Sequence, residues 1–310
     1  MRFLITGALG AIGVWTMRSL LGRGHEVVAL DLGGARHRLA IALDEEQQAS
    51  ITHVNGDITD LRTVERVLDE HAITNVIHLA ALQVPFVRED PVLGAQVNVT
   101  GTTNVLEAVR RRKDRIGPVV YASSIAVYGA AGTLAGDDFP GTLYGVYKRA
   151  NEGTALRYRE DYGVSSLGLR PHTVFGPGRD QGITSAPTVA MIAAAAGRSF
   201  HIPFGGSVQL QYTADTGEAF ARAALLDYEG ASVHDVGGPV VAMAELATMI
   251  DPGGLITTDA NPLPFPSGVD GSTFDALVGD DLLRPVDAGV ADALQRFERL
   301  LADGLVRPPD

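Results

Sequence analysis

The sequence predicts an α/β fold with a doubly wound parallel sheet, and two patterns carry this prediction. Over roughly residues 1–170, short apolar runs alternate with stretches that have helical apolar spacing. The first run ends in a glycine-rich turn that leads directly into a helical stretch. Alternating strands and helices form parallel sheets with right-handed crossovers. Residues 171–310 carry more proline and glycine breaks, so we expect mainly a small second lobe there, with some segments returning to the first domain.

The glycine-rich turn is the clearest local motif. The apolar run Phe3–Ile5 suits a buried parallel strand, and a second strand over Glu26–Leu30 leads to Asp31. Between the two strands, apolar residues recur with the spacing of an amphipathic helix. Three glycines precede that helix at intervals of three residues: Gly7, Gly10 and Gly13.

This order of elements suits a bound dinucleotide. The start of a helix leaves backbone N–H groups unpaired and carries partial positive charge, so a pyrophosphate can dock where glycines leave room. An acidic residue at the end of the second strand can accept hydrogen bonds from the adenosine ribose, and Asp31 holds that position. Its charge would repel a 2'-phosphate, which favours NAD over NADP, although Arg36 and Arg38 leave NADP open.

Composition excludes several classes of protein. The chain has 37 Asp and Glu against 25 Lys and Arg, and a net charge of −12 argues against general binding to nucleic acid or to anionic membranes. It has no cysteine, and its 8 histidines lack the paired spacing of a metal site. No apolar run reaches the ~18 residues of a membrane span, and no targeting segment is visible. We therefore expect a cytoplasmic protein without a metal.

The other elements are expected in order along the chain. Further strands are predicted at Ile51–Asn55, Val76–Leu79, Pro118–Ala122 and Ser165–Leu169. Helices are predicted after Asp60, which is a plausible N-cap, and over Val92–Arg112 and Thr142–Tyr162. The second lobe is predicted to contain a helix over Ala190–Ala196, a strand over Phe200–Pro203 and a helix over Asp215–Leu226.

Tyr144 and Lys148 form the predicted catalytic pair. They are four residues apart on an expected helix, which places them on one face. Taking a proton from a secondary alcohol near neutral pH requires a base, whereas a free tyrosine titrates at about 10. A neighbouring ammonium favours the phenolate, and Lys148 can supply it. Ser124, at a strand end, offers a hydroxyl to the substrate oxygen. Tyr147 is interpreted as a packing residue, and Tyr128 is not included in the catalytic set.

Six motifs occur in order over roughly the first 180 residues: TGALGAIG, NGDITD, HLAA, SSIAVYG, YGVYK and LRPHTVFGPG. They resemble, in turn, the TGxxGxxG cofactor turn, the adenine-contacting segment, the fourth-strand motif, the serine segment, the YxxxK pair and the RPxxVYGPG loop of the extended short-chain dehydrogenase/reductase family. The branch they resemble is that of the NAD-dependent epimerases and dehydratases. The resemblance implies a Rossmann-like sheet with a small C-terminal substrate-binding lobe, and NAD as cofactor.

The resemblance also implies a role for each matching residue. Tyr144 would be the acid/base, Lys148 its pKa modifier and the anchor of the nicotinamide ribose, and Ser124 the binder of the substrate oxygen. The implied cofactor contacts are Gly7, Gly10, Ala11, Ile12, Gly13, Asp31, Asp57, Ile58, Leu79, Ala80, Ala81, Asn98, Tyr144, Lys148, Pro171 and His172. The expected substrate contacts are Gln83, Ser124, Ile125 and Gln211.

Two departures from the family pattern concern the substrate. Dehydratases and decarboxylases carry a carboxylate just after the serine, where this chain has Ile125 and Ala126, so no elimination step is expected. Relatives that act on nucleotide sugars carry an arginine-aspartate pair where GGSVQLQYTAD places Val208 and Gln209. The usual diphosphate anchor is therefore missing, and two cations elsewhere could substitute for it: Arg179 or Arg222.

These observations predict NAD-dependent hydride transfer at a secondary alcohol carbon of a carbohydrate-type substrate. We rank first a sugar epimerase that resembles the 4-epimerases and forms a transient ketone. The alternative is a dehydrogenase of a free sugar, sugar acid or polyol, which the missing diphosphate anchor favours. A non-catalytic NAD-binding protein is the third hypothesis, and the intact Tyr-Lys-Ser set opposes it. The resemblance further implies a homodimer formed through the two long helices.

Overall fold

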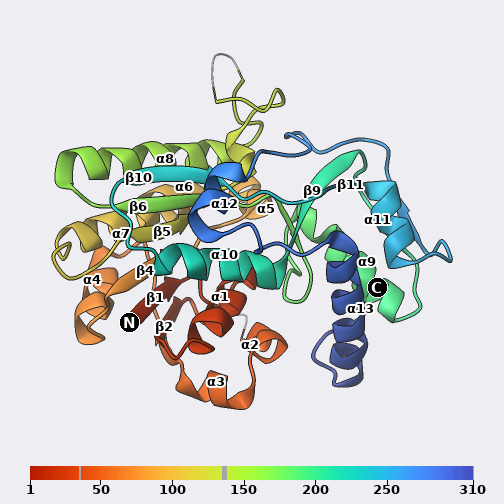
Figure 1. The fold of residues 1–310 in the computed structure, drawn as a ribbon, viewed down its shortest axis with the longest axis horizontal. Coiled ribbons are helices and arrows are strands. Elements are labelled where there is room, and N and C mark those ends of the chain that lie inside the picture. Colours follow the sequence, from red (N-terminus) through yellow and green to blue (C-terminus); the bar gives the residue numbers. More distant parts are fainter. Residues whose placement is uncertain (35, 135–137, 310) are drawn as a thin grey trace.

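The computed structural model describes residues 1–34, 36–134 and 138–309. Seven of the strands in these ranges are β1 (Arg2–Thr6), β2 (Glu26–Asp31), β3 (Thr52–Asn55), β4 (Asn75–His78), β5 (Val119–Ala122), β6 (Ser166–Arg170) and β10 (Ala231–Asp235). They form one parallel sheet in the order β10-β6-β5-β4-β1-β2-β3 (Figure 1). The predicted α/β fold with a doubly wound parallel sheet is confirmed.

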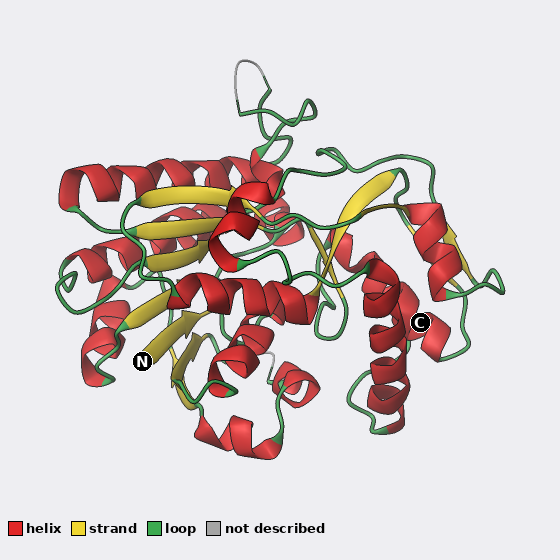
Figure 2. Cartoon of the chain, in the orientation of Figure 1, coloured by secondary structure: helices red, strands yellow, loops and turns green. Residues whose placement is uncertain are grey.

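Helices cover both faces of this sheet (Figure 2). Alternate residues of β1 point to opposite faces, as the pleat of a strand requires, so Phe3 and Ile5 join one core and Leu4 joins the other. The first core is covered by α1 (Ala11–Leu21), α2 (His37–Ala42), α10 (Thr213–Leu225) and α12 (Ser272–Val278). The second core is covered by α4 (Leu61–Glu70), α7 (Gly101–Arg110) and α8 (Leu143–Tyr162). The polar helix α3 (Glu45–Ser50) has no buried residue.

The helix predicted over Val92–Arg112 is helical from Pro91 to Arg110 in the structure: α6 (Pro91–Ala95) continues through one π-helical turn over Gln96–Thr100 into α7. A short helix that was not predicted, α5 (Val84–Glu89), precedes it. Within the π turn, the Asn98 carbonyl accepts hydrogen bonds from the Thr102 hydroxyl at 2.7 Å and from the Asn151 amide at 2.8 Å. Periodicity of apolar residues does not reveal such a turn, and π turns are often found at functional sites.

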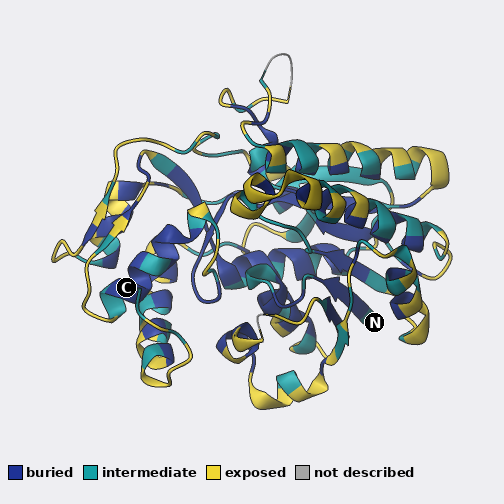
Figure 3. Cartoon of the chain, turned by 180° about the vertical axis from the view of Figure 1, so that it is seen from behind, coloured by how far each residue is buried: buried dark blue, intermediate teal, exposed yellow. Residues whose placement is uncertain are grey.

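The C-terminal part of the chain divides between two places. The strands β7 (Thr173–Phe175), β9 (Ser207–Tyr212) and β11 (Val240–Ala242) form one small sheet, and β8 (Phe200–Ile202) pairs with β12 (Ile256–Thr258). With α9 (Ala186–Ala195), α11 (Met243–Ile250) and α13 (Val286–Ala302), they enclose a separate apolar core, seen as the dark blue interior of the lobe in Figure 3. In contrast, β10, α10 and α12 belong to the body that contains the large sheet. Within the described residues, every helix is too short or too polar to span a bilayer.

Candidate active site

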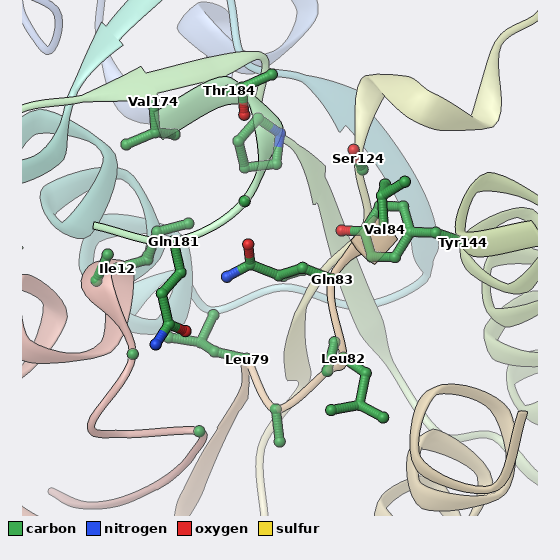
Figure 4. Close-up of a pocket in the computed structure, with 18 of the residues that line it drawn as sticks. Ile12, Leu79, Leu82, Gln83, Val84, Ser124, Tyr144, Val174, Gln181 and Thr184 are labelled. Atoms are coloured by element: carbon green, nitrogen blue, oxygen red, sulfur yellow. The ribbon is translucent and has the colours of Figure 1, made fainter. Parts of the chain in front are cut away.

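A cavity of about 560 Å³ lies along the carboxyl ends of the parallel strands, between the sheet and the lobe. Its wall begins at the glycine turn, passes the ends of β2, β4 and β5, and reaches the loop after β7. Figure 4 shows part of this wall, including Ile12, Gln83, Ser124 and Tyr144. Of the catalytic, cofactor and substrate contacts predicted from the sequence, all except Asn98 and Gln211 line the cavity.

The glycine turn is shaped by close approaches of the backbone. Gly7 has φ +67°, and a Cβ placed there would lie 2.6 Å from the backbone nitrogen of Ala80. A Cβ on Gly13 would lie 2.7 Å from the carbonyl oxygen of Gly7, so the first turn of α1 fits closely against the loop. Asp31 accepts a hydrogen bond from the Leu9 N–H at 3.0 Å at the same end of the cavity. The free N–H groups at the start of α1 and the carboxylate of Asp31 suit the pyrophosphate and ribose of NAD.

Arg38 lies beside this turn, but its guanidinium already has partners. It donates to the Leu9 carbonyl at 3.0 Å and to Asp180 at 2.5 and 3.2 Å, and it is buried. Asp180 comes from the loop after β7, so this ion pair joins the two walls of the cavity. A 2'-phosphate would therefore have to compete with Asp180 for Arg38.

Asn98 lies behind the cavity wall, although it was predicted as a cofactor contact. Its side chain accepts from the Leu82 N–H at 2.7 Å and donates to the Leu82 carbonyl at 2.9 Å, and the residue is 1% exposed. These two bonds fix the loop after β4, which carries Ala80, Ala81 and Gln83 along the cavity. Asn98 therefore positions the wall instead of forming it.

Tyr144 and Ser124 meet at the far end of the cavity because α8 lies unusually close to the loop after β5. The helix begins at Thr142, whose hydroxyl accepts a hydrogen bond from the Gly145 N–H at 3.1 Å. A Cβ on Gly145 would overlap the carbonyl oxygen of Ala126, so glycine at this position permits the contact. Ser124 caps the short turn over Ile125–Val127, and its side chain and that of Tyr144 border the same space (Figure 4).

Two cations lie near the Tyr144 phenol: Lys148 and Arg179. Burial raises the pKa of the Tyr144 phenol, while the hydrogen bond with Ser124 and the positive charge of Arg179 oppose that rise. Lys148 lies 5.7 Å from the centre of the Tyr144 ring and donates to the Ala122 carbonyl at 2.6 Å. Burial lowers the pKa of Lys148 to about 8, and the negative charge of Glu152 opposes that change. Lys148 is thus adjacent to the phenol ring, and Arg179 is a second cation that favours the ionised form of Tyr144.

Glu152 anchors a buried network that the sequence analysis missed. It lies one helical turn after Lys148 and accepts a short hydrogen bond from the Ser123 hydroxyl. Arg170 binds both of its oxygens at 2.7 Å and also donates to the Tyr128 hydroxyl at 2.7 Å. The sequence indicates only that Glu152 lies four residues after Lys148 and therefore on the same face of the helix. Tyr128 lines the cavity, and burial raises the pKa of its phenol.

His172 reaches the cavity with both ring nitrogens engaged. Nδ1 accepts from the Thr173 N–H at 2.8 Å, and Nε2 lies 2.8 Å from the Pro266 carbonyl, to which it donates. Burial lowers the pKa of His172 to about 4, so the ring is neutral near pH 7. Neither nitrogen is therefore available as a general acid.

Gln211 does not reach the cavity, which corrects its expected place among the substrate contacts. Its oxygen accepts from the His172 N–H at 3.0 Å, and its nitrogen donates to the carbonyls of Val236 and Gly237. The residue is 1% exposed, so its amide supports the wall from behind. Successive side chains of β9 point to opposite faces of the small sheet. The sequence alone did not show which face Gln211 occupies.

Of the two cations proposed as substitutes for the missing diphosphate anchor, Arg179 lines the cavity and Arg222 does not. Val208 and Gln209 are buried in β9 and do not line the cavity. Arg222 lies outside the cavity and pairs with Glu218 and Asp281. Arg179 does line it, together with residues that sequence reasoning did not single out: Thr142, Val174, Thr184, Leu263, Pro264 and Phe265.

Comparison with known proteins places these features in context. UDP-glucuronate 4-epimerase 2 of Arabidopsis thaliana is 32% identical over 183 residues, which are 56% of this chain and 42% of that protein. The chain thus spans less than half the length of this relative. An uncharacterized 37.6 kDa protein of Escherichia coli is 32% identical over 72% of this chain and 69% of its own length.

Solved structures with the same architecture cover nearly the whole chain. UDP-glucose 4-epimerase of Thermus thermophilus, solved in complex with NAD, has a TM-score of 0.78 and 26% identity, with 96% of this chain and 99% of that chain covered. An L-threonine dehydrogenase from Cupriavidus necator has a TM-score of 0.81 and 24% identity, with 95% of this chain and 99% of that chain covered. At this identity the similarity is evidence for a shared fold only.

A family description also matches most of the chain. The family of NAD dependent epimerases and dehydratases matches residues 3–231. Its dependence on NAD confirms the cofactor predicted from the glycine turn and Asp31. From its fold, its cavity and this match, the chain belongs to the NAD-dependent epimerase/dehydratase family, a branch of the extended short-chain dehydrogenases/reductases.

Proposed function

We propose that the protein catalyses NAD-dependent hydride transfer at a secondary alcohol carbon of a carbohydrate. The observation that carries this proposal is the single cavity in which Tyr144 and Ser124 stand at one end and the glycine turn at the other. When bound, NAD supplies the acceptor for the hydride that leaves the alcohol carbon. The nicotinamide would lie near Pro171 and Tyr144, and the ribose near Lys148.

Tyr144 would exchange the proton of the reacting hydroxyl. Ser124 would hold the substrate oxygen, so that the phenolate of Tyr144 takes the hydroxyl proton as the C–H bond breaks. Arg179 and Lys148 supply positive charge near the phenolate, which offsets the cost of forming it in a buried site. In the reverse step, the phenol returns the proton to the oxygen.

An epimerase remains the first candidate, and a dehydrogenase the second. The likeness to UDP-glucuronate and UDP-glucose 4-epimerases supports the epimerase. In that case the hydride would return to the other face of a ketone that has turned in the site. The absence of a cation at Val208 and Gln209 favours the second candidate, a dehydrogenase of a free sugar, sugar acid or polyol.

NAD rather than NADP is the proposed cofactor in either case. Asp31 would place negative charge beside a 2'-phosphate, and Arg38 is bound to Asp180 and the Leu9 carbonyl. Equal turnover with both cofactors would contradict this preference.

A homodimer is proposed on the face formed by α5, α6 and α8. Val92 is 69% exposed and Leu156 is 47% exposed, and Phe86, Leu93 and Leu143 are exposed apolar residues of the same helices. Sedimentation of the purified protein should give the mass of two chains, and Leu156→Lys should shift it toward one. The cytoplasmic location stays a prediction.

A substrate screen distinguishes the two candidates. The protein is incubated with NAD and with sugars, sugar acids, polyols and UDP-sugars, while NADH absorbance and isomer formation are followed separately. Isomer formation without net NADH supports the epimerase, and NADH formed in proportion to oxidised product supports the dehydrogenase. Tyr144→Phe should abolish whichever signal is found. Turnover that survives in Tyr144→Phe would contradict the proposed chemistry.

A further inference from the structure

Arg179 is a cation in the cavity wall whose hydrogen-bond partners are uncharged. It follows Gly178 in the loop after β7 and donates to the Gln83 side chain at 3.3 Å, the Gln181 carbonyl at 2.6 Å and the Thr184 hydroxyl at 3.0 Å. Its Nε is buried and has no hydrogen-bond partner among the described residues. The guanidinium is therefore held in place without neutralisation of its charge.

The nearest carboxylate in sequence is committed elsewhere. Asp180 forms its ion pairs with Arg38 at 2.5 Å and with His37 at 3.2 Å. Arg179 is half-buried, and burial lowers the pKa of its guanidinium, although the negative charge of Asp180 opposes that change. Arg88 also lines the cavity but is exposed to solvent, which screens its charge. An anionic group of a ligand would supply what Arg179 lacks.

The position of Arg179 indicates which part of the substrate carries that anion. Its partners Gln83 and Thr184 border the same region of the cavity as Tyr144 (Figure 4). Arg179 and Tyr144 line the same cavity, and the positive charge of Arg179 opposes the rise in the pKa of the Tyr144 phenol that burial causes. An anion on Arg179 would then belong to the same small sugar as the hydroxyl that reacts at Tyr144. A guanidinium fork matches the two oxygens of a carboxylate.

We propose that Arg179 binds the carboxylate of a sugar acid next to the reacting hydroxyl. This inference rests on the proposed function and narrows its substrate class. Gln83 and Thr184 orient the guanidinium, and Asp180 forms its ion pair with Arg38 instead of with Arg179.

The test measures binding and turnover separately. Protein loaded with NAD is titrated in a calorimeter with D-galacturonate, D-glucuronate and D-gluconate, with their neutral counterparts galactose, glucose and sorbitol, and with UDP-glucose. Arg179→Gln should weaken binding of the preferred acid by about 10- to 100-fold, the range of one hydrogen bond to a charged group. Binding of neutral ligands and of NAD should change less than about twofold. Arg179→Lys should bind the acid with intermediate affinity, because it keeps the charge and loses the fork.

Arg222→Gln is the matched control, because Arg222 lies outside the cavity with its own acidic partners. Thermal melting of each variant shows whether it folds. The inference is wrong if no acid binds better than its neutral counterpart. It is also wrong if Arg179→Gln weakens the binding of UDP-glucose or of NAD as strongly as the binding of the acid, because either result would assign Arg179 to a diphosphate. Acid binding that depends on Arg179, without any turnover, would support this inference and contradict the proposed function.

Discussion

The two ends of the cavity are built in different ways. At the cofactor end, backbone atoms define the site: Gly7 and Gly13 permit close approach, and the start of α1 presents its N–H groups. At the substrate end, side chains from separate parts of the chain define it, among them Gln83, Arg179 and Phe265. The first arrangement depends on a short continuous motif and is visible in a sequence. The second depends on how distant segments fold together, which is why substrate specificity is harder to predict than the cofactor.

The largest effect on activity is expected at the substrate end. Tyr144→Phe removes the proposed acid/base and should lower kcat by about 10²- to 10⁴-fold, the usual contribution of such a group. Tyr147→Phe is the control, because Tyr147 is on the same helix but donates to the Pro91 carbonyl instead. Steady-state kinetics on the identified substrate compare the two. Equal losses in both variants would place the chemistry elsewhere.

The next prediction concerns the cofactor end. It distinguishes the effect of a close contact with the backbone from the effect of a positive φ angle alone. Gly7→Ala combines a φ of +67° with a Cβ that would lie 2.6 Å from Ala80, so affinity for NAD should fall by about 100-fold, equivalent to roughly 3 kcal/mol. Gly24→Ala is the matched control: its φ is +76°, and nothing lies within 4 Å of the added Cβ.

Gly24→Ala should cost about 1 kcal/mol of stability and leave NAD affinity unchanged. Fluorescence titration with NAD and chemical unfolding measure these two quantities. Unaltered NAD affinity in Gly7→Ala would show that the backbone of the turn does not shape the cofactor site.

The smallest effect concerns the buried network around Glu152. Burial lowers the pKa of Lys148 to about 8, although the negative charge of Glu152 opposes that change. Glu152→Gln should therefore lower the pKa of Lys148 further, and the ammonium would be lost at a lower pH. The alkaline limb of the pH profile for kcat should move down by about one pH unit.

Glu160→Gln, on the exposed end of the same helix, should leave the profile unchanged. Melting temperatures are measured beside both profiles, because Glu152→Gln also weakens the bonds to Arg170. A lower melting temperature with an unshifted alkaline limb would assign Glu152 a purely structural role.

The sequence predicted six of the seven strands of the large sheet, because these strands and their crossover helices leave local patterns, but it did not predict β10. It predicted less of the lobe, where short strands such as β7 and β11 pair with the distant β9. Residues such as Asn98 and Gln211 were expected in the cavity, but tertiary contacts turn both side chains toward backbone groups behind it. Glu152 was missed because its importance arises from Arg170 and Ser123, which lie on other elements.

A crystal structure of the protein with NAD bound tests the central claim most directly. We expect the nicotinamide beside Pro171, with the Tyr144 hydroxyl directed at the ring carbon that accepts the hydride, and Lys148 within hydrogen-bonding distance of the ribose. A Tyr144 hydroxyl turned away from that carbon, with Lys148 remote from both the phenol and the ribose, would contradict the account.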